Sequence, residues 1–358
     1  MRAALLRGNG GPEMLEVVDD APVPAVGDDD ALIRVSVCGV NNTDINTRVG
    51  WYSRSVTSAT SGDGFADASL DDATWGSSGL TFPRVQGADP CGVVVEVGSA
   101  ADGALTGRRV VVDPWIRDAD HPADRELAGY LGSELDGGFA EYCAVPARNV
   151  YPVDVDLPDT VLAGLACSWS TAAHMLDRAA LVPGGRIAVT GASGGVGSAL
   201  VQLAKVRGAH VTAIAGASKL DAVTALGADV VVTRDADAVP AAAVEHGGGR
   251  FDVVADIVGG LDVGGWTEVL VRGGRYVTAG AIAGPVVDID LRTIYLNDLE
   301  LIGATVFPPR VFADLVGLVE AGRVQPTIAS TYPLAEIHAA QEAFSRKEHI
   351  GNIVITID

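Results

Sequence analysis

A glycine-rich turn at residues 191–197 carries the clearest chemical pattern of this sequence. The apolar stretch 187–190 precedes the turn, a helical pattern opens at Gly195, and a second apolar stretch follows at 211–215. Strand, glycine turn, helix and strand in this order form the unit that binds a dinucleotide, with the pyrophosphate at the helix N-terminus. An ordinary small-residue turn of an α/β domain is the alternative. We assign the following residues of the turn to the cofactor: Ala192, Ser193, Gly194, Gly195, Val196 and Gly197.

Two glycines of this turn have separate expected tasks. Gly194 lets the backbone approach the pyrophosphate, and Gly197 lets the helix pack on the preceding strand. The first glycine of the G-x-G-x-x-G pattern is replaced by Ala192. The helix adds its free N–H groups and the positive end of its dipole, so we expect the phosphates to lie there.

The end of the second strand indicates which dinucleotide is bound. An NAD site normally places Asp or Glu there, which holds the ribose hydroxyls. Here the strand is followed by Gly-Ala-Ser218-Lys219, without an acid. Ser218 and Lys219 lie where a 2′-phosphate would be held, in a chain whose only other lysines are Lys205 and Lys347. We therefore expect NADPH, and the alternative is that Lys219 is a solvated helix residue.

Length and composition indicate a two-domain cytoplasmic protein. The chain has 358 residues, 48% of them hydrophobic, and a net charge of −21. No stretch is long enough to span a membrane, and the N-terminus lacks a signal-peptide pattern. Four scattered cysteines without a C-x-x-C fit a reducing compartment. The acidic surface repels phosphate backbones, so we expect neither nucleic acid nor membrane as a partner. Salt adaptation and a high-GC genome are alternative origins of this Asp-rich composition, and we favour the second.

Hydrophobic periodicity separates a strand-rich first part from an alternating second part. Strands are expected at 1–6, 31–37, 91–98, 109–113 and 137–145. A helix is expected at 161–176, followed by strands near 211–215, 229–233, 251–257 and 274–279 and by helices near 219–226, 261–271 and 310–321. Repeated β–α units predict an α/β fold with a parallel, doubly wound sheet. Residues 53–81 lack periodicity and are expected to form an insertion loop, either a substrate lid or a mobile segment without a role.

Short motifs from one end of the chain to the other occur together in one family. They are Val40-Asn41-x-x-Asp44, Gly50-x-Tyr52, Gly87-Ala88-Asp89, Asp136-Gly-Gly-Phe-Ala-Glu-Tyr142, Pro183-Gly-Gly185, the glycine turn, Leu226-Gly-Ala-Asp229 and Gly351-Asn-Ile-Val354. The pattern resembles the medium-chain dehydrogenase/reductase superfamily, nearest its quinone oxidoreductase branch. The resemblance covers nearly the whole chain except residues 53–81.

This resemblance implies a fold and an assembly. The expected fold is a GroES-like β-barrel catalytic domain, made from 1–153 with 308–358, and a Rossmann cofactor domain at 154–307. Relatives pair through an edge strand of the cofactor sheet, so a homodimer or homotetramer is expected through 299–306. Among cofactor contacts, the resemblance adds Thr171 and, just after the third strand, Arg234.

The resemblance raises the question of zinc, because many relatives are zinc alcohol dehydrogenases. A catalytic zinc needs Cys, His or acidic ligands and one open position. The first ligand position is Cys38 and the third is Cys167, but the histidine of the second is replaced by Ala88, beside Asp89. Residues 99–142 contain no cysteine for a structural zinc. We expect no metal; if one is present, Cys38, Asp89 and Cys167 would hold it.

A metal-free relative must polarise its carbonyl substrate by hydrogen bonding. By resemblance, Tyr52 is the first candidate donor, Asn41 lies by the nicotinamide and substrate, and Asp44 orients the loop. The alternatives are an aromatic wall for Tyr52 and a helix N-cap for Asp44. Trp51 and Trp169 are expected to line the substrate pocket, or else to be ordinary core residues.

Three functional hypotheses follow. The first is an NADPH-dependent oxidoreductase that passes hydride to a quinone, enone or related carbonyl without zinc. The second is an alcohol dehydrogenase, with or without a residual catalytic zinc. The third is a non-catalytic NADPH-binding sensor.

Overall fold

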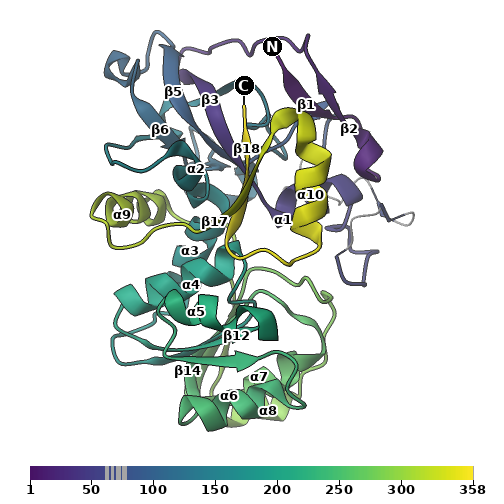
Figure 1. Ribbon diagram of the computed structural model, residues 1–358, viewed down its shortest axis with the longest axis vertical. Helices are drawn as coiled ribbons and strands as arrows, with labels where there is room; N and C mark the ends of the chain where they lie inside the picture. Colours follow the sequence, from purple (N-terminus) through teal and green to yellow (C-terminus); the bar gives the residue numbers. More distant parts are fainter. Residues whose placement is uncertain (61–63, 66–67, 70–73, 75–78, 358) are drawn as a thin grey trace. The chain divides into compact units, whose positions relative to one another are not determined.

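The computed structural model describes residues 1–60, 64–65, 68–69, 74 and 79–357 (Figure 1). Most of the insertion expected at 53–81 lies outside these residues, so its role stays a prediction. Contacts divide the chain into two units, of which the first comprises 1–56, 61–167 and 308–358 and the second 57–60 and 168–307. The division after Cys167 differs from the boundary expected at residue 154, because residues 159–162 form a helix that packs on strands of the first unit.

The first unit is built around a largely antiparallel sheet with the order β10-β6-β5-β3-β18-β17, with β9 also paired to β3, and two small sheets, β2-β1-β4 and β7-β8. Its strands are β1 (Ala3–Leu6), β2 (Leu15–Val18), β3 (Asp30–Val40), β4 (Arg84–Val85), β5 (Asp89–Val97), β6 (Arg109–Val112), β7 (Trp115–Ile116), β8 (Gly129–Tyr130), β9 (Tyr142–Pro146), β10 (Val150–Pro152), β17 (Ile328–Pro333) and β18 (Asn352–Thr356). Its helices are α1 (Asn42–Val49), α2 (Asp159–Leu162), α9 (Pro309–Glu320) and α10 (Ile337–Ser345). Residues far apart in sequence, such as Leu6, Ile33, Phe139 and Ile353, share one buried core.

Helix α1 directly follows the long strand β3 and is unusual because its polar side chains are buried. Thr43, Asp44, Asn46, Thr47 and Arg48 are all buried. Buried polar groups are costly unless they are hydrogen-bonded. Nε of Arg48 donates to Oε1 of Gln341 in α10 at 3.1 Å, and Nη1 donates to a backbone oxygen. This contact joins two helices that also lie side by side in Figure 1.

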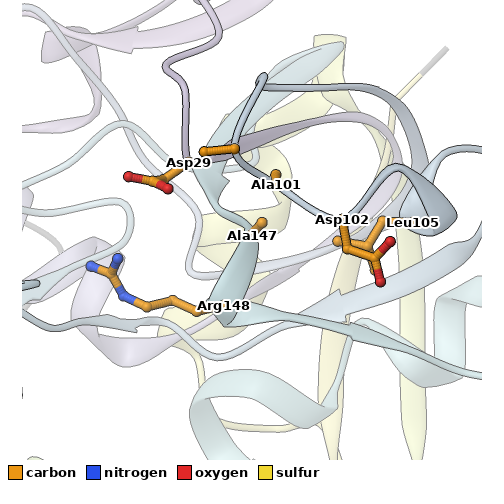
Figure 2. Close-up of a pocket in the computed structure, with 7 residues that line it drawn as sticks. Asp29, Ala101, Asp102, Leu105, Ala147 and Arg148 are labelled. Carbon is orange, nitrogen blue, oxygen red and sulfur yellow. The ribbon is translucent and has the colours of Figure 1, made fainter.

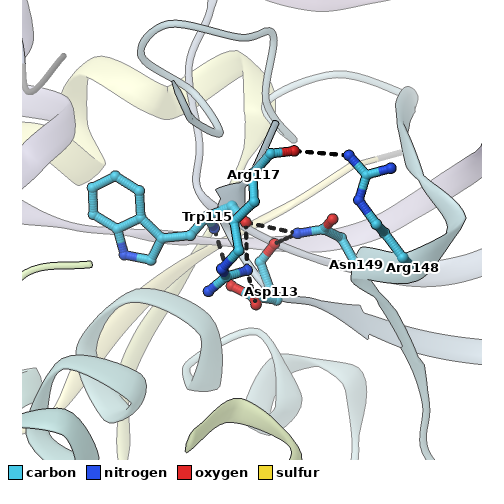
Figure 3. A network of polar contacts seen from close by, with 5 residues as sticks. All are labelled: Asp113, Trp115, Arg117, Arg148 and Asn149. Carbon is cyan, nitrogen blue, oxygen red and sulfur yellow. Dashed lines mark hydrogen bonds and ion pairs between the residues drawn. The ribbon is translucent and has the colours of Figure 1, made fainter. Parts of the chain in front are cut away.

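A second polar network fixes the loop after β6 (Figure 3). The Asp113 carboxylate accepts the backbone N–H of Trp115 at 3.0 Å and pairs with Arg117 at 2.8 Å. Nδ2 of Asn149 donates to the backbone oxygens of Asp113 and Trp115, both at 2.9 Å, and Arg148 donates to that of Arg117. The Trp115 backbone is therefore held through both its N–H and its carbonyl oxygen.

The second unit contains a parallel sheet with the order β13-β12-β11-β14-β15-β16. The strands are β11 (Arg186–Val189), β12 (His210–Ala215), β13 (Val230–Thr233), β14 (Phe251–Asp256), β15 (Leu270–Thr278) and β16 (Glu300–Gly303). The helices are α3 (Ser170–Arg178), α4 (Gly195–Val206), α5 (Leu220–Ala225), α6 (Val239–Gly247), α7 (Val263–Glu268) and α8 (Leu291–Leu296). Helices α4 and α5 cover one face and α6 to α8 the other (Figure 1). The predicted doubly wound sheet is confirmed.

Some predicted elements differ from the structure for identifiable reasons. The helix expected at 161–176 is divided into α2, a π-helix at Leu165–Trp169 and α3. The strand expected at 137–145 begins only at Tyr142, because the N–H groups of residues 137–139 bond instead to the backbone oxygens of residues 85–87. The helix expected at 261–271 ends at Glu268, because β15 begins at Leu270 and pairs with β14. Within the described ranges, none of the helices combines the length and apolar character that crossing a membrane requires.

Candidate active site

The glycine turn of the second unit has the shape of a phosphate cradle. A Cβ at Gly197 would lie 2.1 Å from the backbone oxygen of Gly191, so only glycine lets α4 approach the turn so closely. A Cβ at Gly194 would meet the backbone oxygen of Gly191 at an ordinary contact distance of 3.7 Å, so this position is not crowded by the protein. Ala192 is wholly buried and Ser193 nearly so. The chain's own residues therefore fit a dinucleotide, whose pyrophosphate would face the N–H groups that begin α4.

The structure brings the predicted 2′-phosphate residues together beyond β12. Nζ of Lys219 lies 3.5 Å from Oγ of Ser193 in the glycine turn. A Cβ at Gly216 would lie 3.7 Å from Nε of Arg234, whose side chain is 70% exposed. Ser218 is exposed one residue before Lys219. Two cations and a hydroxyl thus border the end of the strand where an NAD site would place an acid.

Trp169 and Thr171 lie around the start of α3. Thr171 is partly exposed and remains a predicted cofactor contact. Trp169 has no exposed surface. This burial agrees with the alternative of an ordinary core residue, and the place of Trp169 in the wall of a substrate pocket stays a prediction.

A buried polar cluster in the first unit contains the other predicted residues. Asn41 is the N-cap of α1, and its backbone N–H donates to Oδ2 of Asp44 at 2.7 Å. The alternative of Asp44 as N-cap is therefore corrected, since it occupies the third helical position and caps from there. Nδ2 of Asn41 donates to Oδ2 of Asp89 at 2.9 Å, and the N–H of Cys167 donates to Oδ1 at 2.5 Å.

Tyr52 adjoins this cluster. Its hydroxyl hydrogen-bonds with the side chains of Thr43 and Asn46 on α1, and its ring meets that of Trp51 edge-on at 5.7 Å between centroids. Burial raises the pKa of the Tyr52 phenol, so it stays a protonated donor at neutral pH. Trp51 is partly exposed, as a pocket residue would be.

Tyr130 is a member of the cluster that the sequence did not indicate. Its hydroxyl hydrogen-bonds with the Cys167 thiol, and its ring packs edge-on against Trp115 at 4.6 Å. Burial raises the pKa of Tyr130 well above its usual value. Gln86 was also missed, and its Nε2 donates to the backbone oxygen of Asp44 at 2.8 Å. Tyr130 lies in the short strand β8, and Gln86 directly precedes the Gly87-Ala88-Asp89 motif without being part of it.

Burial dominates the electrostatics of the two carboxyls. It raises the pKa of Asp89 to about 8, against the opposing hydrogen bonds from Asn41 and Cys167. It raises the pKa of Asp44 to about 7, against the N–H groups of Asn41 and Gly87. The two groups also repel each other when charged, so the cluster favours at least one neutral carboxyl near neutral pH.

Replacing Asp89 by Asn is expected to flatten the pH dependence of stability. The folded chain holds this proton up to about pH 8, whereas an unfolded Asp releases it near about pH 4. The folded state therefore binds more protons between these values, and the free energy of unfolding falls as the pH rises through them. Urea unfolding at several pH values measures this fall. An equally steep fall in Asp89→Asn would contradict the assignment.

One pocket of about 380 Å³ lies elsewhere in the first unit (Figure 2). It is lined by Asp29, Ala100, Ala101, Asp102, Leu105, Ala147 and Arg148. None of the predicted site residues is among them. We therefore assign the chemistry to the polar cluster and the glycine turn, not to this pocket.

Comparison with known proteins decides the family. The alcohol dehydrogenase GroES-like domain matches residues 27–155, and the zinc-binding dehydrogenase family matches residues 195–321. A crystal structure from Sinorhizobium meliloti 1021, designated a candidate alcohol dehydrogenase, is 44% identical, with 100% of this chain and 97% of that chain covered and a TM-score of 0.89. The chain belongs to the medium-chain dehydrogenase/reductase superfamily. It is an oxidoreductase with a Rossmann sheet and a GroES-like domain, as the resemblance implied.

Relatives within this superfamily carry two kinds of name. A NAD-dependent alcohol dehydrogenase of Sulfolobus acidocaldarius is 29% identical over 100% of both chains. Human quinone oxidoreductase is 26% identical, over 96% of this chain and 93% of the human protein. A thermostable alcohol dehydrogenase of Pyrobaculum aerophilum, also solved with cobalt and zinc bound, is 33% identical over 99% of both chains with a TM-score of 0.82.

The chain's own residues do not fit the zinc of such relatives. Among the described residues, no group of three or more His, Cys, Asp and Glu side chains is arranged to hold a metal ion, and Cys38, Asp89 and Cys167 form no such group. Both oxygens of Asp89 already accept amide hydrogen bonds, and Tyr130 engages the Cys167 thiol. Ala88 supplies no ligand.

Proposed function

We propose that this oxidoreductase transfers hydride from NADPH to a quinone, an enone or a related carbonyl, without a metal. The observation that carries the proposal is the hydrogen-bonded group of Asn41, Asp89 and Cys167. By the resemblance, Cys167 takes a zinc-ligand position of the zinc dehydrogenases, and Asp89 lies beside the Ala88 that replaces their histidine. A site without a Lewis acid suits substrates whose acceptor carbon is already activated by conjugation. The family's nicotinamide supplies the hydride.

The remaining chemistry falls to the chain's own side chains. When a carbonyl accepts hydride, its oxygen gains negative charge, and a fixed donor lowers that barrier. Tyr52 is the proposed donor, because its phenol is held by Thr43 and Asn46 and stays protonated. Asn41 and Asp44 hold the start of α1, and therefore the residues that orient Tyr52.

The preference for NADPH rests on Ser218, Lys219 and Arg234. The 2′-phosphate would meet two cations there, whereas the ribose hydroxyls of NADH would meet no acid. Two relatives are named as NAD-dependent alcohol dehydrogenases, whereas the residues of this chain at this position favour the phosphorylated cofactor.

Alcohol dehydrogenase activity is the second candidate, favoured by the names of several relatives. Steady-state turnover of quinones, enones, aldehydes and alcohols with each cofactor separates the two functions. We expect quinones or enones with NADPH to give the highest kcat/KM. Higher efficiency with a simple alcohol and NAD would favour the second function, and tight NADPH binding without any turnover would favour a sensor.

A homodimer through the edge of the cofactor sheet is part of the proposal. Strand β16 ends the sheet order, so its outer backbone groups lack a strand neighbour within the sheet. The nearby apolar side chains Leu291, Tyr295, Leu296 and Leu301 are between 47% and 73% exposed in the single chain. A second copy paired along β16 would cover them. Light scattering is expected to give a dimer or tetramer mass, and a monomer mass would contradict the pairing.

A further inference from the structure

Asp256 lies at the point of the parallel sheet where the order of successive strands reverses. It ends β14 at the carboxyl edge of the sheet, and its residue surface is 1% exposed. Strand β11 stands between β12, which follows it in sequence, and β14, so the strand order reverses at this point. Ligands of open α/β sheets bind outside the carboxyl ends of the strands at such a reversal.

The Asp256 carboxylate accepts hydrogen bonds from three segments at this edge. The hydroxyl of Thr190, the residue before the glycine turn, donates to Oδ1 at 2.5 Å. The backbone N–H groups of Val258 and Gly259 donate to the same oxygen at 2.8 and 3.2 Å. The Tyr276 hydroxyl from β15 donates to Oδ2. A carboxyl group offers two acceptor oxygens to these donors, whereas an amide offers only one.

The loop after β14 also touches the glycine turn directly. A Cβ at Gly191 would lie 3.1 Å from the Ile257 side chain and 3.3 Å from that of Val258. The N–H of Ile257 donates to Oγ1 of Thr190 at 3.2 Å. Gly259 and Gly260 have positive φ angles of 65° and 77°. Glycine adopts positive and negative φ about equally readily, so it does not by itself favour this conformation. The loop is held by the Asp256 and Thr190 contacts together with two backbone hydrogen bonds, from the N–H of Gly260 to the oxygen of Gly284 and from the N–H of Ala283 to the oxygen of Val258.

We propose that Asp256 is a positioning residue that holds loop 257–260 against the glycine turn and thereby orders the nicotinamide half of the bound cofactor. The two halves of a dinucleotide bind on opposite sides of the reversal, the adenosine half over the β12 side and the other half over the β14 side. Asp256 ties both sides together through Thr190 and the loop. The proposal rests on the family's nicotinamide cofactor and is independent of the NADPH preference.

Asp256→Asn tests the proposal, because an amide cannot accept all the donors that the carboxylate accepts. Fluorescence titration is expected to show about tenfold weaker binding of NADPH and NADH. Binding of 2′,5′-ADP and of ADP, which lack the nicotinamide half, is expected to be unchanged. Asp298→Asn is the matched control, since Asp298 is an exposed partner of Arg272 in the same unit.

A different effect on whole-cofactor affinity and on fragment affinity, here called the split, distinguishes a positioning residue from one with a merely structural role. Equal losses for cofactor and fragment, or no loss for either, would overturn the proposal. Tyr276→Phe serves if Asp256→Asn fails to fold, since it removes one donor and keeps the ring. Tyr276→Phe is expected to weaken binding of the whole cofactor by less than Asp256→Asn does, and to leave binding of the ADP fragments unchanged. Weaker binding of cofactor and fragments alike would also overturn the proposal. A preference for NADH in every variant would refute the NADPH assignment but leave this split in place.

Discussion

Replacing Tyr52 by phenylalanine is expected to lower kcat on the order of 10²-fold, the usual effect of removing one donor from a charge-stabilising site. The ring and its packing against Trp51 are kept, so only the hydroxyl is lost. Cofactor affinity is expected to stay unchanged, because the glycine turn that binds the phosphates belongs to the other unit. Steady-state kinetics with a quinone or enone, together with cofactor titration, measure both quantities.

Tyr151→Phe is the matched control for this substitution. Tyr151 is in β10 of the same unit, and its ring packs against Phe312 at 5.0 Å between centroids. Its charged neighbours are Asp113 and Arg117, which lie in the loop after β6 and not in the polar cluster. Wild-type turnover in Tyr52→Phe, or an equal loss in both variants, would remove Tyr52 from the chemistry.

The second large effect is expected from Lys219→Ala combined with Arg234→Ala. Each cation would form a charge-assisted hydrogen bond with the 2′-phosphate, so losing both is expected to lower kcat/KM with NADPH by about 100-fold. The value with NADH is expected to change little, because NADH carries no group for these cations. Measurements with both cofactors therefore show a change in preference and not only a general loss.

Lys205→Ala and Arg272→Ala control for the loss of positive charge. Lys205 pairs with Asp229 at 2.8 Å and Arg272 with Asp298 at 2.8 Å, both within the cofactor unit. An equal fall in kcat/KM with NADPH and with NADH in the double variant would mean that the two cations affect the net charge or the folding of the protein and not the 2′-phosphate. Wild-type discrimination in the double variant would place the 2′-phosphate elsewhere.

The cofactor turn could be predicted from sequence because its constraints are local. Gly197 is required by a backbone oxygen only six residues earlier, and strand, turn and helix follow one another without interruption. The alternation of β and α segments likewise gave the parallel sheet, since each strand is apolar and each crossover is short. Features that are set by residues close together in the sequence can therefore be predicted without knowing the rest of the fold.

The polar cluster could be predicted only in part because its contacts are long-range. A helix with the composition of α1 is typical of an exposed surface, yet Asp44 and Arg48 are buried. Their partners Gln86 and Gln341 come from segments 42 and 293 residues away. Tyr130 meets Cys167 because the π-helix turns that residue toward Asp89, and no sequence pattern announces such a turn. Resemblance to the family supplied Tyr52 and Asn41 where local physics could not.

The most direct test of metal-free catalysis is kcat/KM for quinone or enone reduction with NADPH before and after prolonged dialysis against a chelator. We expect the same value in both preparations, because Asp89 and Cys167 are hydrogen-bonded and the described residues contain no group arranged to hold a metal ion. Activity that disappears on chelation and returns on adding zinc would contradict this expectation.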